Sequence, residues 1–137
     1  MSKLGFDKAL KNIQRVQREL PKVIANDTKN YFLNTWREQG HEGDPWEEPK
    51  RWQKKNPTRR DKSAILVQSG ALRRAVANSL KVATWEKIYF DVTDVKYAGY
   101  NNYGTEYIPP RPFMVHSFKL QKKQLDKIQS YFKKVWT

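Results

Sequence analysis

The stretch FDKALKNIQRVQRELPKVIANDTKNYFLNTW (residues 6–36) determines how the chain begins to fold. Its apolar residues recur mostly every three or four positions, with charged residues between them: Phe6, Leu10, Ile13, Val16, Leu20, Ile24, Tyr31 and Trp36. This spacing predicts a long amphipathic helix. Pro21 lies inside it. Because proline removes one helical hydrogen bond and clashes with the preceding turn, we expect a kink there, or two helices that meet.

Residues 37–64 follow this helix and are rich in glycine, proline and charge, with no hydrophobic period. We expect one extended loop, and loops of that length are usually functional or disordered. Trp46 and Trp52 lie in it, and because a solvated loop does not need two tryptophans, we expect something to cover them. Only Asp61 opposes a run of basic residues in its second half: Lys50, Arg51, Lys54, Lys55, Arg59, Arg60 and Lys62.

Strand signals appear after this loop. Apolar residues alternate with smaller or polar ones in Val76–Val82 and again in Ile88–Val92, which predicts an antiparallel hairpin with its turn at Thr84–Lys87. The segment ILVQSGALRRAV (residues 65–76) precedes the hairpin and indicates a Ser-Gly turn followed by a short helical turn.

The rest of the chain alternates helix and extended signals. KYAGYNNY (96–103) predicts a short helix that ends at Gly104, since glycine is common just past a helix end. TEYIPPRPF (105–113) should run extended because proline disfavours helix for itself and its predecessor. Apolar spacing from Val115 to Trp136 predicts a final amphipathic helix. We therefore expect one α+β domain, residues 1–137, with both long helices packed on a small antiparallel sheet.

Composition limits the class of protein. The chain has 137 residues and no cysteine, which excludes disulfides and suits a reducing cytoplasm. We expect no signal peptide from its N-terminal residues, and because no apolar run is long enough to span a bilayer we expect no membrane contact. Its net charge of +13 favours polyanions, either nucleic acid or acidic protein. Three interpretations of the basic run stay open: a solvated loop, an acidic protein partner, or DNA.

The sequence offers no catalytic constellation. His41 and His116 lack a second ligand at helical spacing, so a metal site is not expected. His41 and Glu42 form at most half an acid–base pair, with no third group nearby in sequence. Phosphate-binding glycine motifs are absent. We therefore predict no enzyme, no cofactor and no small-molecule substrate.

The segment IPPRPF (108–113) has two interpretations. As proline-rich sequence it could adopt polyproline II and bind an aromatic groove. As a rigid extended strut it would place Arg111 and Phe113 against a neighbouring protein. One short segment inside a folded domain favours the strut.

Four segments in order carry a resemblance to a known family: GDPWEEP (43–49), LVQSGALRRAV (66–76), KYAGYNNYGTE (96–106) and IPPRPFM (108–114). With their flanking helices they resemble the phage virion morphogenesis family, the tail-completion and neck proteins of Mu-like and related tailed phages. The likeness covers about residues 30–120. The chain departs from the family at GYNNY (99–103), where members commonly have His and Gln or Phe, and in its unusually basic loop.

This resemblance implies a structural virion protein at the head–tail junction or tail end, assembled in the host cytoplasm. It would form a ring, for which we expect six-fold symmetry, with other neck and tail proteins, and packaged DNA is a further possible contact. The alternative is a basic nucleic-acid-binding module. We expect the basic run to contact these partners and the following residues to form the interface: Trp46, Trp52, Ser69, Gly70, Leu72, Tyr97, Tyr103, Gly104, Pro110, Arg111, Pro112 and Phe113.

Overall fold

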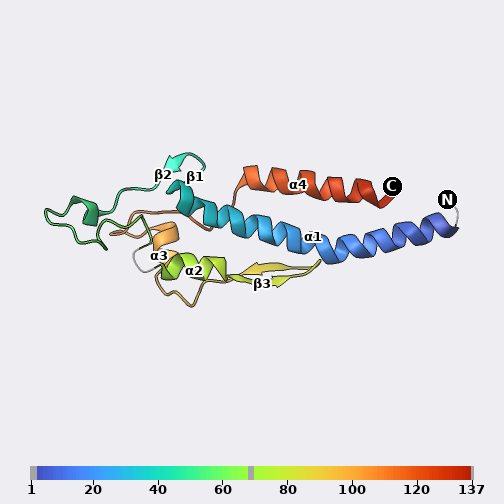
Figure 1. Cartoon of the computed structure of the whole chain (residues 1–137), viewed down its shortest axis with the longest axis horizontal. Helices are drawn as coiled ribbons and strands as arrows, with labels where there is room; N and C mark the ends of the chain where they lie inside the picture. Colours follow the sequence, from blue (N-terminus) through green and yellow to red (C-terminus); the bar gives the residue numbers. More distant parts are fainter. Residues whose placement is uncertain (1–2, 68–69, 137) are drawn as a thin grey trace. The chain divides into compact units, whose positions relative to one another are not determined.

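A computed structural model describes residues 3–67 and 70–136 of the chain (Figure 1). Its elements are α1 (Lys3–Glu38), β1 (Gly40–His41), β2 (Asp44–Pro45), the 3-10 turn η1 (Lys50–Gln53), α2 (Ala71–Ala77), β3 (Leu80–Ala83), β4 (Ile88–Phe90), α3 (Ala98–Tyr103), α4 (Phe118–Lys133) and η2 (Lys134–Trp136). The described strands form two antiparallel pairs, β1–β2 and β3–β4. The predicted α+β class, with a long N-terminal helix and a C-terminal helix, is confirmed.

The chain divides into two compact units. Unit 1 contains Met1–Thr28, Leu80–Phe90 and His116–Thr137, and unit 2 contains Lys29–Ser79 and Asp91–Val115. Each unit has an apolar core of its own. The expectation that residues 1–137 form a single domain stays a prediction.

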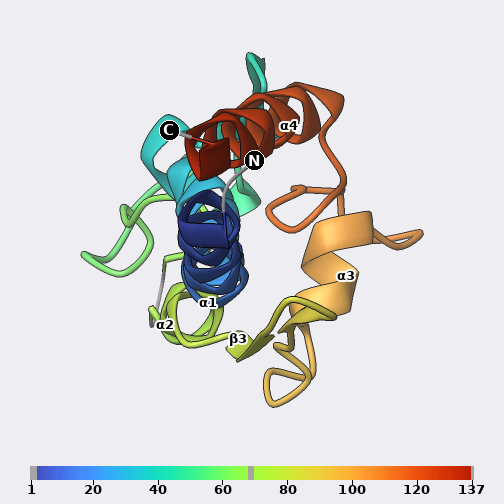
Figure 2. The same cartoon turned by 90° about the vertical axis from the view of Figure 1, so that its right-hand side faces the viewer.

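In unit 1, α4 lies beside the N-terminal part of α1 (Figures 1 and 2). The core of unit 1 is built from Ala9, Val16 and Leu20 of α1 and Val135 of η2, with Ile13, Ile24, Ile128 and Tyr131 around it. Polar contacts border this core: Gln124 Nε2 donates to Thr28 Oγ1 at 2.7 Å, and Lys127 pairs with Asp27. Part of the apolar stripe predicted for the first helix, Ile13, Val16, Leu20 and Ile24, therefore lies on the face that packs, whereas Phe6 and Leu10 remain exposed.

The helix α1 continues through Pro21, so the alternative of two helices meeting there is wrong. A proline at this position costs one backbone hydrogen bond, because it has no N–H to donate. Leu20 and Ile24, on either side of it, pack in the core of unit 1 and hold the helical path. Packing thus outweighs the local preference of one residue.

The predicted hairpin is present as β3 and β4, with Thr84 and Lys87 closing the turn. The Thr84 N–H donates to the Lys87 carbonyl at 2.8 Å, and the Lys87 N–H donates back at 3.2 Å. The first strand begins at Leu80, not at Val76. Val76 instead lies in α2, where its side chain is fully buried in the core of unit 2. The predicted helical turn before the hairpin is thus longer than expected and includes the start of the predicted strand.

Unit 2 is organised around two tryptophans and a phenylalanine. The Trp36 ring lies 5.8 Å from that of Trp46, nearly perpendicular to it, and 5.1 Å from that of Phe113. Ile65, Leu72, Val76 and Ala98 complete the core. Residues 37–64 are therefore not a structureless loop, since they contain β1, β2 and η1 and contribute Trp46 to this core. The periodicity of the sequence did not predict these elements or the burial of Trp46, because a single buried residue produces no repeating pattern.

The remaining predicted elements are present with shifted ends. α3 ends at Tyr103, and Gly104 follows with φ of 77°, as the glycine signal predicted. The final helix begins at Phe118, three residues after Val115, where the Ser117 side chain accepts a hydrogen bond from the Leu120 N–H at 3.1 Å. A serine in this position satisfies one otherwise unpaired helical donor and so sets the start.

Candidate functional site

Several of the predicted interface residues belong to the core of unit 2. The exposed fraction of Phe113 is 1%, that of Leu72 2% and that of Trp46 4%. Their side chains are almost fully covered by their own unit, so none of them can act as a protruding interface anchor. The interpretation of Phe113 and Trp46 as interface anchors is therefore corrected, and both are core residues.

Other predicted interface residues do reach the surface. Tyr103 is the most exposed of them, and Trp52, Tyr97 and Pro110 are exposed too. Gly70, Gly104 and Pro112 are half-buried, and Ser69 lies outside the described residues. The expectation that both loop tryptophans are covered is right for Trp46 and wrong for Trp52.

The side chains of the basic run lie mostly at the surface, but the carboxylate of Asp61 binds part of the run through hydrogen bonds. Asp61 is buried and accepts hydrogen bonds from the Thr58 N–H and hydroxyl, both at 2.9 Å, and from Lys54 at 3.0 Å. These donors, led by the Thr58 N–H, lower the pKa of Asp61 to about 2. Lys50, Lys54, Lys55, Arg59, Arg60 and Lys62 are exposed, whereas Arg51 is half-buried.

Three arginines meet at one cavity of unit 2, which we call the arginine pocket. Its volume is about 420 Å³, and its wall consists of Arg51, Arg60, Leu66, Leu72, Tyr97, Asn101 and Arg111. The arginines come from η1, from the loop after it and from the proline-rich strut, so segments far apart in sequence supply the charge. The predicted contacts Arg51, Arg60, Tyr97 and Arg111 are thus brought together.

Two of these guanidinium groups are anchored by backbone carbonyls. Arg111 donates from Nε and Nη2 to the Glu47 carbonyl, at 3.0 and 2.9 Å. Arg51 donates from Nη2 to the carbonyls of Ser63, at 3.0 Å, and Ala64, at 2.7 Å. These contacts orient the two groups without neutralising their charge.

Arg51 and Arg111 are both partly desolvated, and the charge of Arg51 acts unfavourably on Arg111. Burial lowers the pKa of Arg51 and, together with the charge of Arg51 itself, that of Arg111. The carboxylates of Asp61 and Glu47 offset part of these shifts. Within the described part of the chain, however, none of the three arginines makes an ion pair, and Arg51 Nε is buried without an acceptor.

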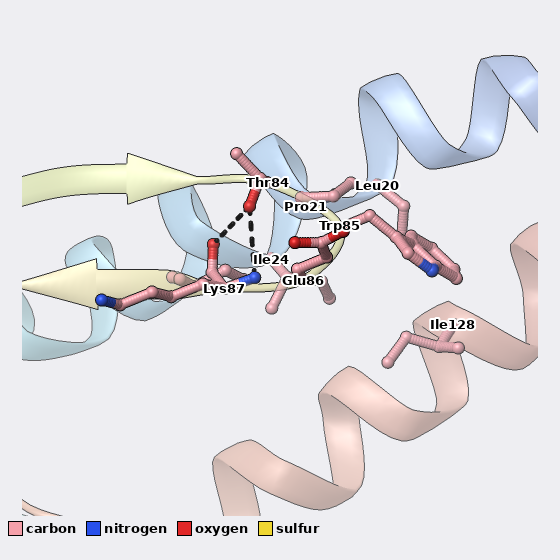
Figure 3. Close-up of a pocket in the computed structure, with 9 residues that line it drawn as sticks. Leu20, Pro21, Ile24, Thr84, Trp85, Glu86, Lys87 and Ile128 are labelled. Carbon is pink, nitrogen blue, oxygen red and sulfur yellow. Dashed lines mark hydrogen bonds between the residues drawn. The ribbon is translucent and has the colours of Figure 1, made fainter.

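Unit 1 has an apolar groove of about 350 Å³ (Figure 3). Its wall consists of Leu20, Pro21, Ile24, Thr84, Trp85, Glu86, Lys87, Ile88 and Ile128. The hairpin turn presents the half-exposed Trp85 ring, which makes an edge-to-face contact with Phe132 of α4 at 6.1 Å.

The helix α4 also carries an apolar stripe that its own unit leaves exposed. Phe118, Leu125 and Phe132 follow one another at intervals of seven residues, with exposed fractions of 81%, 51% and 40%. A seven-residue interval keeps side chains on one side of a helix. We call these three residues the α4 stripe. The sequence identified these residues as apolar. It did not show that they lie next to the face of α4 that packs in the core of unit 1 and are not part of it.

One polar cluster escaped the sequence analysis. The hydroxyl of Tyr31, on α1, donates to Glu42 Oε1 at 2.8 Å. The oxygen of this tyrosine hydroxyl also lies 2.9 Å from His41 Nε2. With that arrangement the hydroxyl accepts from a protonated Nε2. Tyr31 is thus a third group beside the His41–Glu42 pair, but neither cavity described above includes any of them.

No protein-family model, curated protein or solved structure matches this chain. Within the described residues, no three His, Asp or Glu side chains are placed to hold a metal ion. Among the described helices, none has the length and apolarity needed to cross a membrane.

Proposed function

We propose that this protein is a non-enzymatic structural component of a tailed phage virion, acting at the head–tail junction or tail end by forming a ring with its own copies and with neck or tail proteins. The exposed α4 stripe is the observation that carries this proposal. In coiled coils, apolar side chains repeated every seven residues pack against a partner helix, so an exposed stripe of this kind fits a docking face. The resemblance of residues 30–120 to virion morphogenesis proteins supports the proposed place in the virion.

The chemistry of the surface supports an assembly role. Large apolar side chains remain exposed in both units, among them Tyr103 and Tyr107 in unit 2 and Phe118 and Trp136 in unit 1. Aromatic residues are enriched in protein interfaces, where burying their area supplies much of the binding energy. The exposed lysines and arginines of the basic run would then select acidic neighbours and suppress wrong ones.

The test is assembly of phage that carries this gene, with two matched variants of α4. Leu125→Lys places a charge in the α4 stripe, whereas Ser130→Lys adds the same charge at an exposed position about 140° around the helix. Electron microscopy should show filled heads and unjoined tails for Leu125→Lys and complete virions for Ser130→Lys. Both purified variants should keep the parent melting temperature.

Two results would overturn the proposal. One is complete virions from Leu125→Lys at normal yield. The other is a gene with no portal, capsid or tail genes in its neighbourhood.

A second candidate function is a basic nucleic-acid-binding module, favoured by the net charge of +13 and by the exposed Tyr97 beside the arginine pocket. Basic residues that track a backbone and aromatic rings that stack bases are the usual means of binding single strands. This candidate predicts that the isolated protein binds oligonucleotides with an affinity that falls steeply as salt rises. The virion proposal requires no such affinity.

A further inference from the structure

The arginine pocket concentrates positive charge in a way that folding alone does not explain. Arg51, Arg60 and Arg111 all line one cavity, and no acidic residue of the described part of the chain lines it. Like charges at short range repel each other, and the repulsion grows as water is removed. Arg51 and Arg111 are both partly desolvated, and the charge of Arg51 acts on Arg111.

The donors of the pocket are left partly unused. Arg111 donates from Nε and Nη2 to the Glu47 carbonyl, and Arg51 donates from Nη2 to the carbonyls of Ser63 and Ala64. Among the described residues, Nη1 of both groups has no acceptor. The Arg60 guanidinium makes no hydrogen bond there either, although its backbone carbonyl accepts from Ser63. An arriving anion would therefore find oriented donors.

We infer that the arginine pocket binds a phosphate monoester carried on a planar ring, as in a nucleotide or at the 5′ end of a nucleic-acid strand. A phosphate dianion offers several acceptor oxygens to guanidinium groups, whose planar donors match phosphate geometry. A single carboxylate offers half the charge. The inference is independent of the virion proposal.

The rest of the wall fits the ring. Tyr97, Leu66 and Leu72 also line the cavity and carry no charge, and Asn101 adds an amide. A tyrosine ring stacks on a base of any sequence. The volume of about 420 Å³ falls within the usual range for small-molecule sites and exceeds what one carboxylate side chain needs.

The experiment measures binding of adenosine 5′-monophosphate to the full chain by calorimetry, with adenosine and a hexaglutamate peptide as comparison ligands. Arg60→Gln removes one pocket charge, and Arg59→Gln removes the same charge from an exposed neighbour that does not line the pocket. We expect Arg60→Gln to weaken binding at least about 10-fold, because it removes a charged donor to the phosphate. Arg59→Gln should change it less than about 2-fold, as expected for a screened surface charge.

Two further arms identify the ligand. Arg111→Lys keeps the charge but removes the planar fork, and it should weaken the nucleotide while the unfolding midpoint shows that the chain still folds. A 5′-phosphorylated oligonucleotide that binds more tightly than its unphosphorylated form and than the mononucleotide would identify a strand end as the source. Preference for the mononucleotide would identify a free nucleotide.

Contrary results are equally definite. Equal losses in Arg59→Gln and Arg60→Gln would mean that diffuse charge, not the pocket, attracts anions. Binding of hexaglutamate as tight as that of the nucleotide, and sensitive to Arg60→Gln, would make the pocket a receptor for acidic protein. Absence of nucleotide binding at millimolar concentration would also overturn the inference.

Discussion

Asn102 and Phe113 are joined by a buried hydrogen bond in which the Phe113 N–H donates to Asn102 Oδ1 at 2.8 Å. The same oxygen accepts from the Met114 N–H at 3.0 Å, and Asn102 Nδ2 donates to the Met114 carbonyl at 3.0 Å. One side chain of α3 thus satisfies three backbone groups of the segment that ends the proline-rich strut. This gives a structural role to one residue of the GYNNY segment (99–103).

Replacing Asn102 with Ala should destabilise the protein by about 2–4 kcal/mol, because it leaves buried donors and an acceptor without partners, each at a cost of about 1–3 kcal/mol before the backbone relaxes. Urea denaturation measures this directly. The neighbour Asn101 is a matched control, since its side chain makes one exposed bond to the Tyr97 carbonyl at 3.1 Å. Asn101→Ala should cost less than about 1 kcal/mol, and equal losses would contradict the assigned role.

Phe113→Ala should cost about 3–5 kcal/mol, as for other buried aromatic rings. The ring packs on Trp36 and is almost fully enclosed, so its removal leaves a cavity. Tyr103→Ala removes a ring that is 74% exposed and should change the free energy of unfolding by less than about 0.5 kcal/mol. If Phe113→Ala were as stable as the parent, the assignment of Phe113 to the core would be wrong and its interpretation as a surface residue would stand.

The sequence predicted those parts of the fold that depend on periodic patterns. Apolar spacing located both long helices, and alternation located the hairpin and its turn at Thr84–Lys87. The errors lie where one contact overrides a pattern. Val76 looked like the start of a strand because its neighbours alternate, but its burial in unit 2 makes it part of α2.

The site was less predictable than the fold. Residue type identified Arg51, Arg60 and Arg111 as candidates for charged contact, but their sequence separation hides that they share one cavity. The strut interpretation placed Phe113 outward because sequence does not say which side of an extended segment is covered. Tyr31 was not connected with His41 and Glu42, because α1 ends and the chain turns back between them.

Gly104→Ala should be destabilising by at least about 1 kcal/mol because two effects add. Gly104 has φ of 77°, which strains any residue with a Cβ, and that Cβ would lie 2.8 Å from the Pro110 nitrogen. Gly99 is a matched control inside α3, where a Cβ meets nothing within 4 Å. Gly99→Ala should stabilise by about 0.5–1 kcal/mol, since alanine is the better helix former. Thermal unfolding of both variants should show a lower melting temperature than the parent for Gly104→Ala and a higher one for Gly99→Ala.

The last prediction concerns acid and the buried Asp61. Hydrogen bonds from Thr58 and Lys54 favour the ionised carboxylate, which places the pKa of Asp61 at about 2 in the folded protein. In the unfolded chain the carboxyl should titrate near its ordinary value of about 3.9. The folded state therefore binds fewer protons in this range, and the stabilisation is complete above the unfolded pKa. It is lost as the pH falls from about 4 to about 2.

Asp61→Asn removes this titration while keeping the size of the side chain. The melting temperature of the parent should exceed that of the variant by a constant amount above about pH 5, and the difference should shrink between about pH 4 and pH 2. Asp94→Asn changes the net charge equally at an exposed position of the same unit and shows how much of the trend belongs to charge alone. If the gap between parent and Asp61→Asn stayed constant down to pH 2, or followed that of Asp94→Asn, the hydrogen bonds of Thr58 and Lys54 would not be holding the carboxylate. Since these bonds close the basic run on itself, the same pH interval should release Lys54 and increase exchange of the Thr58 amide, which hydrogen exchange measures independently.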